Sequence, residues 1–390
     1  MSAVPSAARS TVLRQLQKIE RSFDRAFEAQ GNPWRHLGAL GFFLFWVIAA
    51  SGIYLYIFFD TSVDGAYRSV AALTRGQWYA GGVMRSLHRY ASDAFVVVVA
   101  LHLVKEFLHR RYAGFRWFSW LTGVPLVWLL FASGIGGYWL VWDELAQFIA
   151  IATTEWLDWL GFFGEPLARN FLTVDSISSR FFTLLVFLHI GIPLALLLGM
   201  FIHVQRVSQP DTNPARALGW GAFAALLALS LALPAVSMEP ADLALMPRRL
   251  EFDWYYLFAY PLVYSWSPAA VWALAAAVTA ALAALPLLTR RRAAAVAQVD
   301  IENCNGCARC FADCPYEAVV MRARAGGKPG QQHAVVIAGL CASCGICAGA
   351  CPSATPFRSN ERLTTGIDMP QSTVHRLRAQ LEAALARLAG

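Results

Sequence analysis

The segment SLHRYASDAFVVVVALHLV, residues 86–104, has a histidine near each end and no charged side chain after Asp93. In a helix, the fourteen residues from His88 to His102 complete nearly four turns and advance about 21 Å, so the two imidazoles share one helix face. An apolar helix of this length can cross a membrane. The spacing therefore predicts one histidine near each membrane surface.

A second segment, FLHIGIPLALLLGMFIHV at residues 187–204, repeats this spacing with His189 and His203. We expect both segments to cross in the same direction, which sets His88 level with His189 and His102 level with His203. Two imidazoles that face one another across a helix bundle can hold a haem iron from both sides. The pattern favours two stacked haems, although a histidine in a membrane helix can also be a satisfied polar group or line a cavity.

Two further segments carry glycines at the same spacing. Gly38 and Gly52 lie fourteen residues apart, as do Gly123 and Gly137. Glycine allows another group to approach the backbone closely, so a porphyrin edge could lie against each of these positions. Ordinary packing of small residues between helices is the alternative for any single pair.

The whole chain has the composition of a membrane protein: of its 390 residues, 57% are hydrophobic and 15% are charged. Six stretches are long and apolar enough to cross a membrane as helices, and they lie at roughly 37–59, 87–108, 118–141, 181–204, 217–236 and 267–289. We therefore predict an all-α membrane bundle of six transmembrane helices over residues 37–292, with a di-haem four-helix core.

The loops between these stretches predict the orientation of the chain. The N-terminal arm, the loops on its side and the start of the segment after the last stretch (Arg290, Arg291 and Arg292) hold fifteen Lys and Arg residues, and the opposite loops hold seven. Because basic loops stay in the cytosol, we expect both termini to be cytosolic in a bacterial inner (cytoplasmic) membrane. This bias accounts for the net charge of +7, so no nucleic-acid partner is needed.

The first 36 residues contain no apolar core of signal-peptide length. The stretch VLRQLQKIERSFDRAF at residues 12–27 instead has apolar residues at helical spacing and basic residues largely elsewhere. Residues 1–36 therefore predict a cytosolic amphipathic helix, which lies on the membrane surface or on the protein's own cytosolic face.

All eight cysteines lie after residue 292, in two copies of the pattern C-x2-C-x2-C-x3-C-P. The copies comprise Cys304, Cys307, Cys310 and Cys314, and Cys341, Cys344, Cys347 and Cys351. Disulfides are not expected in the reducing cytosol. Three thiolates at this spacing fold around one iron–sulfur cubane, while the fourth points to a second cluster. Two zinc sites are the alternative, but zinc requires only four ligands per site and no third cysteine at this spacing.

These motifs resemble the bacterial two-cluster ferredoxins. The resemblance implies two [4Fe-4S] clusters, one bound by Cys304, Cys307, Cys310 and Cys351 and the other by Cys341, Cys344, Cys347 and Cys314. We expect an α+β ferredoxin-like domain over residues 293–366. The final residues, 367–390, have leucines at helical spacing and predict a C-terminal amphipathic helix.

The membrane part resembles the cytochrome b subunit of quinol–cytochrome c oxidoreductases, over residues 19 to about 266. The matching stretches are NPWRHLGAL, RSLHRY, LHLVK, GGYWLVWDELAQF and SRFFTLLVFLHIGIPLALL. The resemblance implies two b-type haems and a homodimer or larger complex. It also suggests Arg85 and Lys105 as partners of the haem propionates, although both side chains could simply snorkel to the membrane interface.

The stretch LEFDWYYLFAYPL, residues 250–262, looks like the Pro-Glu-Trp-Tyr segment that lines the outer quinol site of that family. Asp253 stands at the acid position, and Trp254 and Tyr255 match the aromatic ones. A carboxylate beside an apolar pocket can exchange a proton with a quinol oxygen. Two departures, Phe252 and Val141 in place of family prolines, leave the pocket shape open, and an interfacial aromatic belt is the alternative.

Together these features predict electron transfer between a cytosolic redox partner, a flavin or iron–sulfur oxidoreductase, and the membrane quinone. An alternative is a membrane anchor and relay subunit without a quinone site of its own. A third possibility, reduction of metal or oxygen outside the cell, requires an exposed outer haem. The chain has no nucleotide-binding glycine-rich loop. Any flavin or nicotinamide chemistry therefore belongs to a partner.

Overall fold

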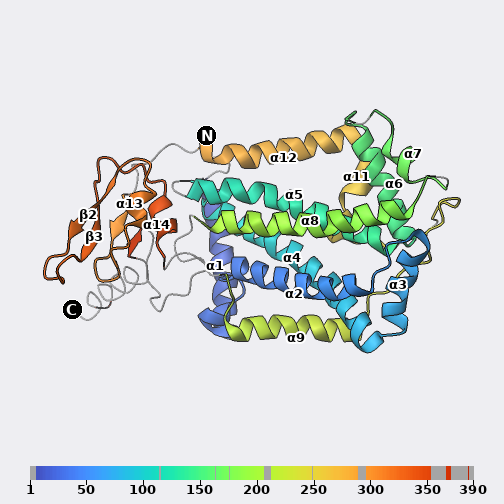
Figure 1. The fold of residues 1–390 in the computed structure, drawn as a ribbon, viewed down its shortest axis with the longest axis horizontal. Helices are drawn as coiled ribbons and strands as arrows, with labels where there is room; N and C mark the ends of the chain where they lie inside the picture. Colours follow the sequence, from blue (N-terminus) through green and yellow to red (C-terminus); the bar gives the residue numbers. More distant parts are fainter. Residues whose placement is uncertain are drawn as a thin grey trace.

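The computed structural model describes residues 6–113, 116–162, 164–174, 176–205, 212–247, 249–288, 296–352, 366–369 and 385. Long helices lie side by side in a bundle, and a small unit with short strands lies beyond one end of it (Figure 1). We call this end the inner end of the bundle and the opposite one the outer end.

Six long helices coincide with the six apolar stretches of the sequence. They are α2 (Leu37–Phe58), α4 (Val83–Leu108), α5 (Trp117–Val141), α8 (Ser179–Val204), α9 (Arg216–Ala232) and α12 (Pro268–Leu288). By length and composition, four of the described helices, α2, α5, α8 and α12, can cross a membrane. The shorter α9 has 17 residues, and α4 carries charged side chains along its length. A membrane helix satisfies all its backbone hydrogen bonds internally, which favours helices for such apolar segments.

The central helices form two packed pairs. Helix α2 packs along α4, and α5 packs along α8. Outside these pairs, α9 packs on α4 and α12 packs on α5 (Figure 1). The core between them is apolar, with Leu44, Ala91 and Phe182 almost completely buried.

Short helices cover the outer end of the bundle (Figure 1). They are α3 (Val63–Arg75), the π-helix η1 (Trp78–Gly82), α6 (Glu144–Asp158), α7 (Leu167–Phe171), α10 (Trp254–Leu257) and α11 (Ala259–Ser265). Side-chain caps start three of them: Ser62 accepts a hydrogen bond from the Gly65 amide, Asp143 accepts one from the Ala146 amide, and Asp253 accepts one from the Tyr255 amide. The Asp143 carboxylate also accepts from the Met238 amide and so ties α6 to the segment after α9.

The N-terminal helix α1 (Ser6–Gly31) runs across the inner end of the bundle (Figure 1). It is attached to the protein's own surface, because Asp24 forms an ion pair of 2.7 Å with Arg35 just before α2. The fully buried Asn32 adds a hydrogen bond to the same carboxylate. The Phe23 ring contacts Trp34 edge-on. The sequence predicts that this helix lies either on the membrane surface or on the protein's own cytosolic face. In the structure, the helix contacts the protein's own surface.

The small unit contains β1 (Gln298–Val299), α13 (Arg309–Ala312), β2 (Val319–Ala323), β3 (Gln332–Val336), α14 (Ile346–Ala350) and β4 (Ile367–Asp368). Strands β2 and β3 form an antiparallel hairpin, and β1 pairs antiparallel with β4. The sequence predicts that this domain ends at residue 366. The β1–β4 pairing extends it at least to Met369, because β4 and the residue that follows it supply the buried Ile367 and Met369 to its core. Residues 367–368 of the predicted C-terminal helix thus form a strand; apart from Met369 and Leu385, the rest of that predicted helix lies outside the described residues.

Candidate redox centres

The four membrane histidines form two facing pairs between α4 and α8. The ring centroids of His88 and His189 are 6.2 Å apart, and those of His102 and His203 are 6.5 Å apart. An ion bound at about 2 Å from one nitrogen on each ring separates the centroids by roughly 6 Å. Both pairs therefore have the separation that two axial ligands of one iron require.

Hydrogen bonds orient the outer pair. The Nδ1 atom of His88 lies 3.0 Å from the Ile48 carbonyl oxygen, and that of His189 lies 3.0 Å from the Ser133 carbonyl oxygen. Because a carbonyl oxygen only accepts, each Nδ1 must carry the proton. The other ring nitrogen, Nε2, then keeps its lone pair for a metal, as is usual for metal-binding histidines.

The glycines at the same spacing contact these imidazoles. A Cβ added at Gly52 would lie 3.0 Å from His88 Cε1, one at Gly137 would lie 3.0 Å from His189 Cε1, and one at Gly123 would lie 3.0 Å from His203 Cε1. At Gly38 the distance to His102 Cε1 is a comfortable 3.7 Å. In the structure, an imidazole from another helix lies against each of these glycines. The contact of a porphyrin edge with the same glycines stays a prediction.

The two predicted propionate partners are held by neutral groups. Arg85 is buried and donates hydrogen bonds to Thr74 Oγ1 at 2.7 Å and Ser237 Oγ at 2.9 Å. The Lys105 ammonium donates to the Trp34 carbonyl oxygen. None of these acceptors is a carboxylate, so both cations keep their positive charge available to an anion at their end of the bundle.

The cysteines line two cavities in the small unit. Cys304, Cys307, Cys310 and Cys351 line one, and Cys314, Cys341, Cys344 and Cys347 line the other. Each cavity thus takes three cysteines from one motif and the fourth from the other motif. Among the described residues, no three His, Cys, Asp or Glu side chains converge on a point that could hold a single ion. Sulfurs arranged around a cavity suit a cluster better than a single zinc ion.

Two cysteines are buried deeply enough to change their chemistry. Burial raises the pKa of the Cys310 and Cys347 thiols to about 12. Positive charge from a bound metal stabilises the thiolate and overcomes this effect.

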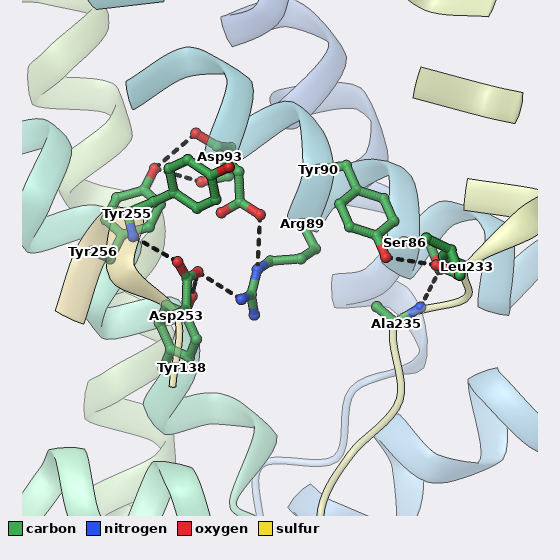
Figure 2. A network of polar contacts seen from close by, with 11 residues as sticks. Ser86, Arg89, Tyr90, Asp93, Tyr138, Leu233, Ala235, Asp253, Tyr255 and Tyr256 are labelled. Carbon is green, nitrogen blue, oxygen red and sulfur yellow. Dashed lines mark hydrogen bonds and ion pairs between the residues drawn. The ribbon is translucent and has the colours of Figure 1, made fainter. Parts of the chain in front are cut away.

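The side chains of the three residues predicted for quinone chemistry point in different directions. The Asp253 side chain is only 5% exposed and points into the bundle, whereas Trp254 is 65% exposed and Tyr255 is 50% exposed. As Figure 2 shows, Asp253 accepts hydrogen bonds from the Arg89 guanidinium at 2.6 Å and from the Tyr255 amide at 2.7 Å. The Tyr138 hydroxyl donates to the same carboxylate. The acid is therefore bound in a polar network, and the two aromatics face outward.

This network contains residues that the sequence analysis did not select. Arg89 on α4 joins Asp253 to Asp93, whose Oδ2 lies 3.2 Å from Arg89 Nε (Figure 2). The Tyr256 hydroxyl bonds to Ser92 on α4, and its ring packs on Gly134 of α5. A signal was present in the sequence, because ionisable residues within a membrane helix are costly and usually functional.

A second overlooked residue, Arg116, lies where the bundle meets the small unit. Electrostatic interactions connect Arg116 with His102 and with Asp368 of β4. Burial lowers the pKa of Arg116 to about 10, while Glu106 and Asp368 act in the opposite direction. Arg116 therefore stays charged at neutral pH, and it lies between the inner histidine pair and β4. Ile367 of β4 lines one cysteine cavity, and Met369, which follows this strand, lines the other.

Paired imidazoles in an apolar helix bundle, joined to a unit with cysteine-lined cavities, define a membrane protein of electron transfer that uses haem and iron–sulfur chemistry. Residues 25–210 match the family model of cytochrome b/b6/petB, and residues 291–355 match that of the 4Fe-4S dicluster domain. The chain thus carries an N-terminal cytochrome b domain and a C-terminal 4Fe-4S ferredoxin domain.

A solved structure titled "Hyperthermophilic respiratory Complex III" contains a similar chain. The two chains are 21% identical, and the match covers 65% of this chain and 75% of that chain with a TM-score of 0.53. At this identity the likeness shows a shared fold.

Proposed function

We propose that this protein transfers electrons between a cytosolic redox partner and the membrane quinone, through two [4Fe-4S] clusters and two b-type haems. The observation that carries the proposal is the line of centres along the molecule. Two histidine pairs lie fourteen residues apart on α4 and α8. The small unit, which contains the two cysteine cavities, lies beyond the inner end of the bundle (Figure 1).

In this proposal, His88 and His189 hold the outer haem, and His102 and His203 hold the inner one. Haem iron with two axial histidines carries single electrons and has no open position for a substrate. The centroid distances of 6.2 and 6.5 Å and the Nδ1 hydrogen bonds of the outer pair support these assignments. Arg85 and Lys105 remain candidates to bind the propionates, because the hydrogen-bond acceptors that hold them, Thr74, Ser237 and the Trp34 carbonyl, carry no negative charge.

The cluster ligands follow the shared cavities. We assign Cys304, Cys307, Cys310 and Cys351 to one cluster and Cys314, Cys341, Cys344 and Cys347 to the other. Arg116 interacts electrostatically with His102 and with Asp368 of β4, so it links the proposed inner haem site with the cluster unit.

The proposed membrane arrangement has six transmembrane helices, with α4 and α9 added to the four that meet the length and composition of a span. Both termini are then cytosolic in a bacterial inner membrane, and the domains are residues 1–36, 37–292 and a ferredoxin-like unit that continues to Met369. The cytosolic partner docks on this unit. The likeness to a chain of a respiratory complex supports assembly into a larger complex, whereas a homodimer is implied by the family resemblance alone.

Quinone chemistry is proposed at the outer end, near Asp253. If electrons enter from the cytosol and reach a quinone there, they move with the membrane field, which contributes about 2.3 kcal/mol per charge for each 100 mV. Such a route suits a cytosolic donor that is not strongly reducing. The position of Asp253 supports this location, because a carboxylate there can exchange a proton with a quinone oxygen.

The test is the variant Asp253→Asn in proteoliposomes, with the haems reduced beforehand and menadione as the oxidant. We expect haem reoxidation to slow at least tenfold while the haem spectrum stays unchanged. The matched control is Asp64→Asn, because Asp64 is an exposed acid in the first turn of α3. Equal rates in both variants would refute the quinone site at Asp253.

A second candidate function is a relay subunit without quinone chemistry. One observation favours it: Asp253 is occupied by Arg89 and Tyr138, and Trp254 and Tyr255 face outward rather than enclosing the acid. The Asp253→Asn experiment separates the two functions, since a relay is indifferent to the loss of this carboxylate.

A further inference from the structure

Two carboxylates and one arginine form a compact cluster beside the outer histidine pair (Figure 2). Arg89, which directly follows His88 in the chain, donates to Asp253 Oδ2 at 2.6 Å and to Asp93 Oδ2 at 3.2 Å. The Arg89 guanidinium also lies 4.6 Å from the centre of the Tyr138 ring. Asp93 is 15% exposed and Asp253 is 5% exposed, so both acids are largely withdrawn from water.

The charges of this cluster do not balance when both acids are ionised. Arg89 supplies one positive charge, and the two carboxylates would supply two negative charges. A net buried charge in an apolar bundle is costly, and two close carboxyl groups relieve this cost when one of them holds a proton. One proton is therefore expected to reside in the cluster.

The hydrogen bonds indicate which acid holds it. Asp253 accepts from Arg89, from the Tyr138 hydroxyl and from the Tyr255 amide, and three donors stabilise an ionised carboxylate. Asp93 accepts from Arg89 at the longer distance of 3.2 Å, and its buried Oδ1 has no hydrogen-bond partner among the described residues. The proton belongs on Asp93.

We propose that Asp93 is the proton store of the outer site and recharges Asp253 during quinone reduction, an inference that rests on the proposed quinone chemistry. A quinone takes up two electrons and two protons to become a quinol. The electrons come one at a time from the outer haem and ultimately from the cytosolic donor. Asp253 passes each proton to a quinone oxygen.

The proton balance then runs through the two carboxyl groups. The O–H bond of Asp93 breaks as an O–H bond forms on Asp253, and this bond breaks in turn as the quinone O–H bond forms. After each transfer, Asp93 takes up a new proton from the aqueous phase at the outer surface. Asp93 acts through Asp253 and is therefore a positioning and relay residue, with Arg89 keeping the two acids together.

The ionisable groups that face Asp93 come from three segments. Arg89 precedes it by one turn on α4, Tyr138 belongs to α5, and Asp253 and Tyr256 belong to the start of α10. The Tyr256 hydroxyl is engaged by Ser92 rather than by Asp93. The state of Asp93 is therefore set mainly by Arg89 and Asp253.

The experiment measures menadione-driven reoxidation of the reduced haems across pH, in proteoliposomes, for Asp93→Asn, Asp93→Glu, Asp253→Asn and the control Asp64→Asn. We expect Asp93→Asn to be slower than the unaltered protein by about 10²-fold at neutral pH, with the rate recovering as pH falls and protons reach Asp253 from water. Asp93→Glu should retain most of the rate. Asp253→Asn should be slow at every pH.

Infrared spectroscopy of the resting protein gives a readout that does not depend on turnover. Asp93→Glu should shift the protonated-carboxyl band, whereas Asp253→Glu should leave it in place. The inference would be overturned if Asp253→Glu shifts the band and Asp93→Glu leaves it in place. It would also be overturned if Asp93→Asn keeps an unaltered rate and pH profile while Asp253→Asn is slow. In both cases the proposed function would still stand. An unaltered rate in Asp253→Asn would instead reject the quinone site itself. If Asp93→Asn loses its haem spectrum through misfolding, the infrared band of Asp93→Glu still shows whether Asp93 holds the proton.

Discussion

His88 on α4 faces His189 on α8 with 6.2 Å between their ring centroids, and each imidazole is oriented by a backbone carbonyl of a neighbouring helix. The carbonyls come from Ile48 on α2 and Ser133 on α5. The four central helices thus contribute either a ring or the group that orients it. On α2 and α5, the glycines at the fourteen-residue spacing also lie against the imidazoles.

Replacement of single histidines should remove one haem at a time. We expect His88→Ala or His189→Ala to lose the outer haem and about half of the reduced haem absorbance, and His102→Ala or His203→Ala to lose the inner one. Haem content per protein and a redox titration measure this. His109→Ala is the control, because His109 is an exposed histidine just after α4. Full haem content in any of the four variants would contradict the assignment.

Two glycines beside the inner pair should differ in their tolerance of a methyl group. In Gly123→Ala, the added carbon meets His203 Cε1 at 3.0 Å, whereas in Gly38→Ala it meets His102 Cε1 at an ordinary 3.7 Å. Overpacking of this kind typically costs about 1–3 kcal/mol. We therefore expect Gly123→Ala to weaken inner-haem binding or alter its low-spin EPR signal. Gly38→Ala should resemble the unaltered protein, and equal effects of both would argue against ring contact as the cause.

Each cavity depends on one cysteine from the other motif. We expect Cys351→Ala to disrupt the cluster of Cys304, Cys307 and Cys310, while the cluster of the second motif stays intact. Iron and acid-labile sulfide should fall to about half, and the EPR of the reduced protein should show one cluster. The control is Ala342→Ser, because Ala342 lies within the second motif but is not a ligand. Loss of the cluster of Cys341, Cys344 and Cys347 would contradict the pairing.

The charge of Arg116 should tune the inner haem. Positive charge nearby favours the reduced haem, so Arg116→Gln should lower the midpoint potential of the inner haem by roughly 40 mV, or about 1 kcal/mol, with the outer haem unaffected. A redox titration resolves the two haems. Arg116→Lys keeps the charge and should restore the potential. An equal shift of both haems would indicate a general structural change.

The attachment of α1 should weaken in acid. Hydrogen bonds from Arg35 and Asn32 hold the pKa of Asp24 well below its ordinary value. The contribution of a lowered carboxyl pKa is fully present above the ordinary value of about 4 and is lost as pH falls below it. Hydrogen exchange of α1 should therefore increase over this acidic range. In Asp24→Asn, α1 should exchange quickly already at neutral pH, and protection equal to that of the unaltered protein would contradict this.

Local patterns in the sequence determined the helices and the chemistry of the centres. The ranges of α2, α5, α8 and α12 follow from continuous apolar composition, because a segment that crosses a membrane must satisfy its own backbone. The level pairing of the four histidines follows from helix geometry, since a fixed rise and rotation per residue convert spacing into depth and direction. Each cysteine motif likewise places three of the cysteines of one cavity within a short loop, and the fourth comes from the other motif.

Only the tertiary structure decided what lies between these elements. Arg89 and Asp253 are 164 residues apart in the chain and meet because α10 packs against α4. In the same way, an imidazole from another helix lies against each glycine, and β4 pairs with β1 past the expected domain end. Spacing along one helix fixes a side chain's direction, but the partner in that direction depends on the rotation and packing of a different helix. That partner is set by burial and charge compensation across the bundle, which no single segment encodes.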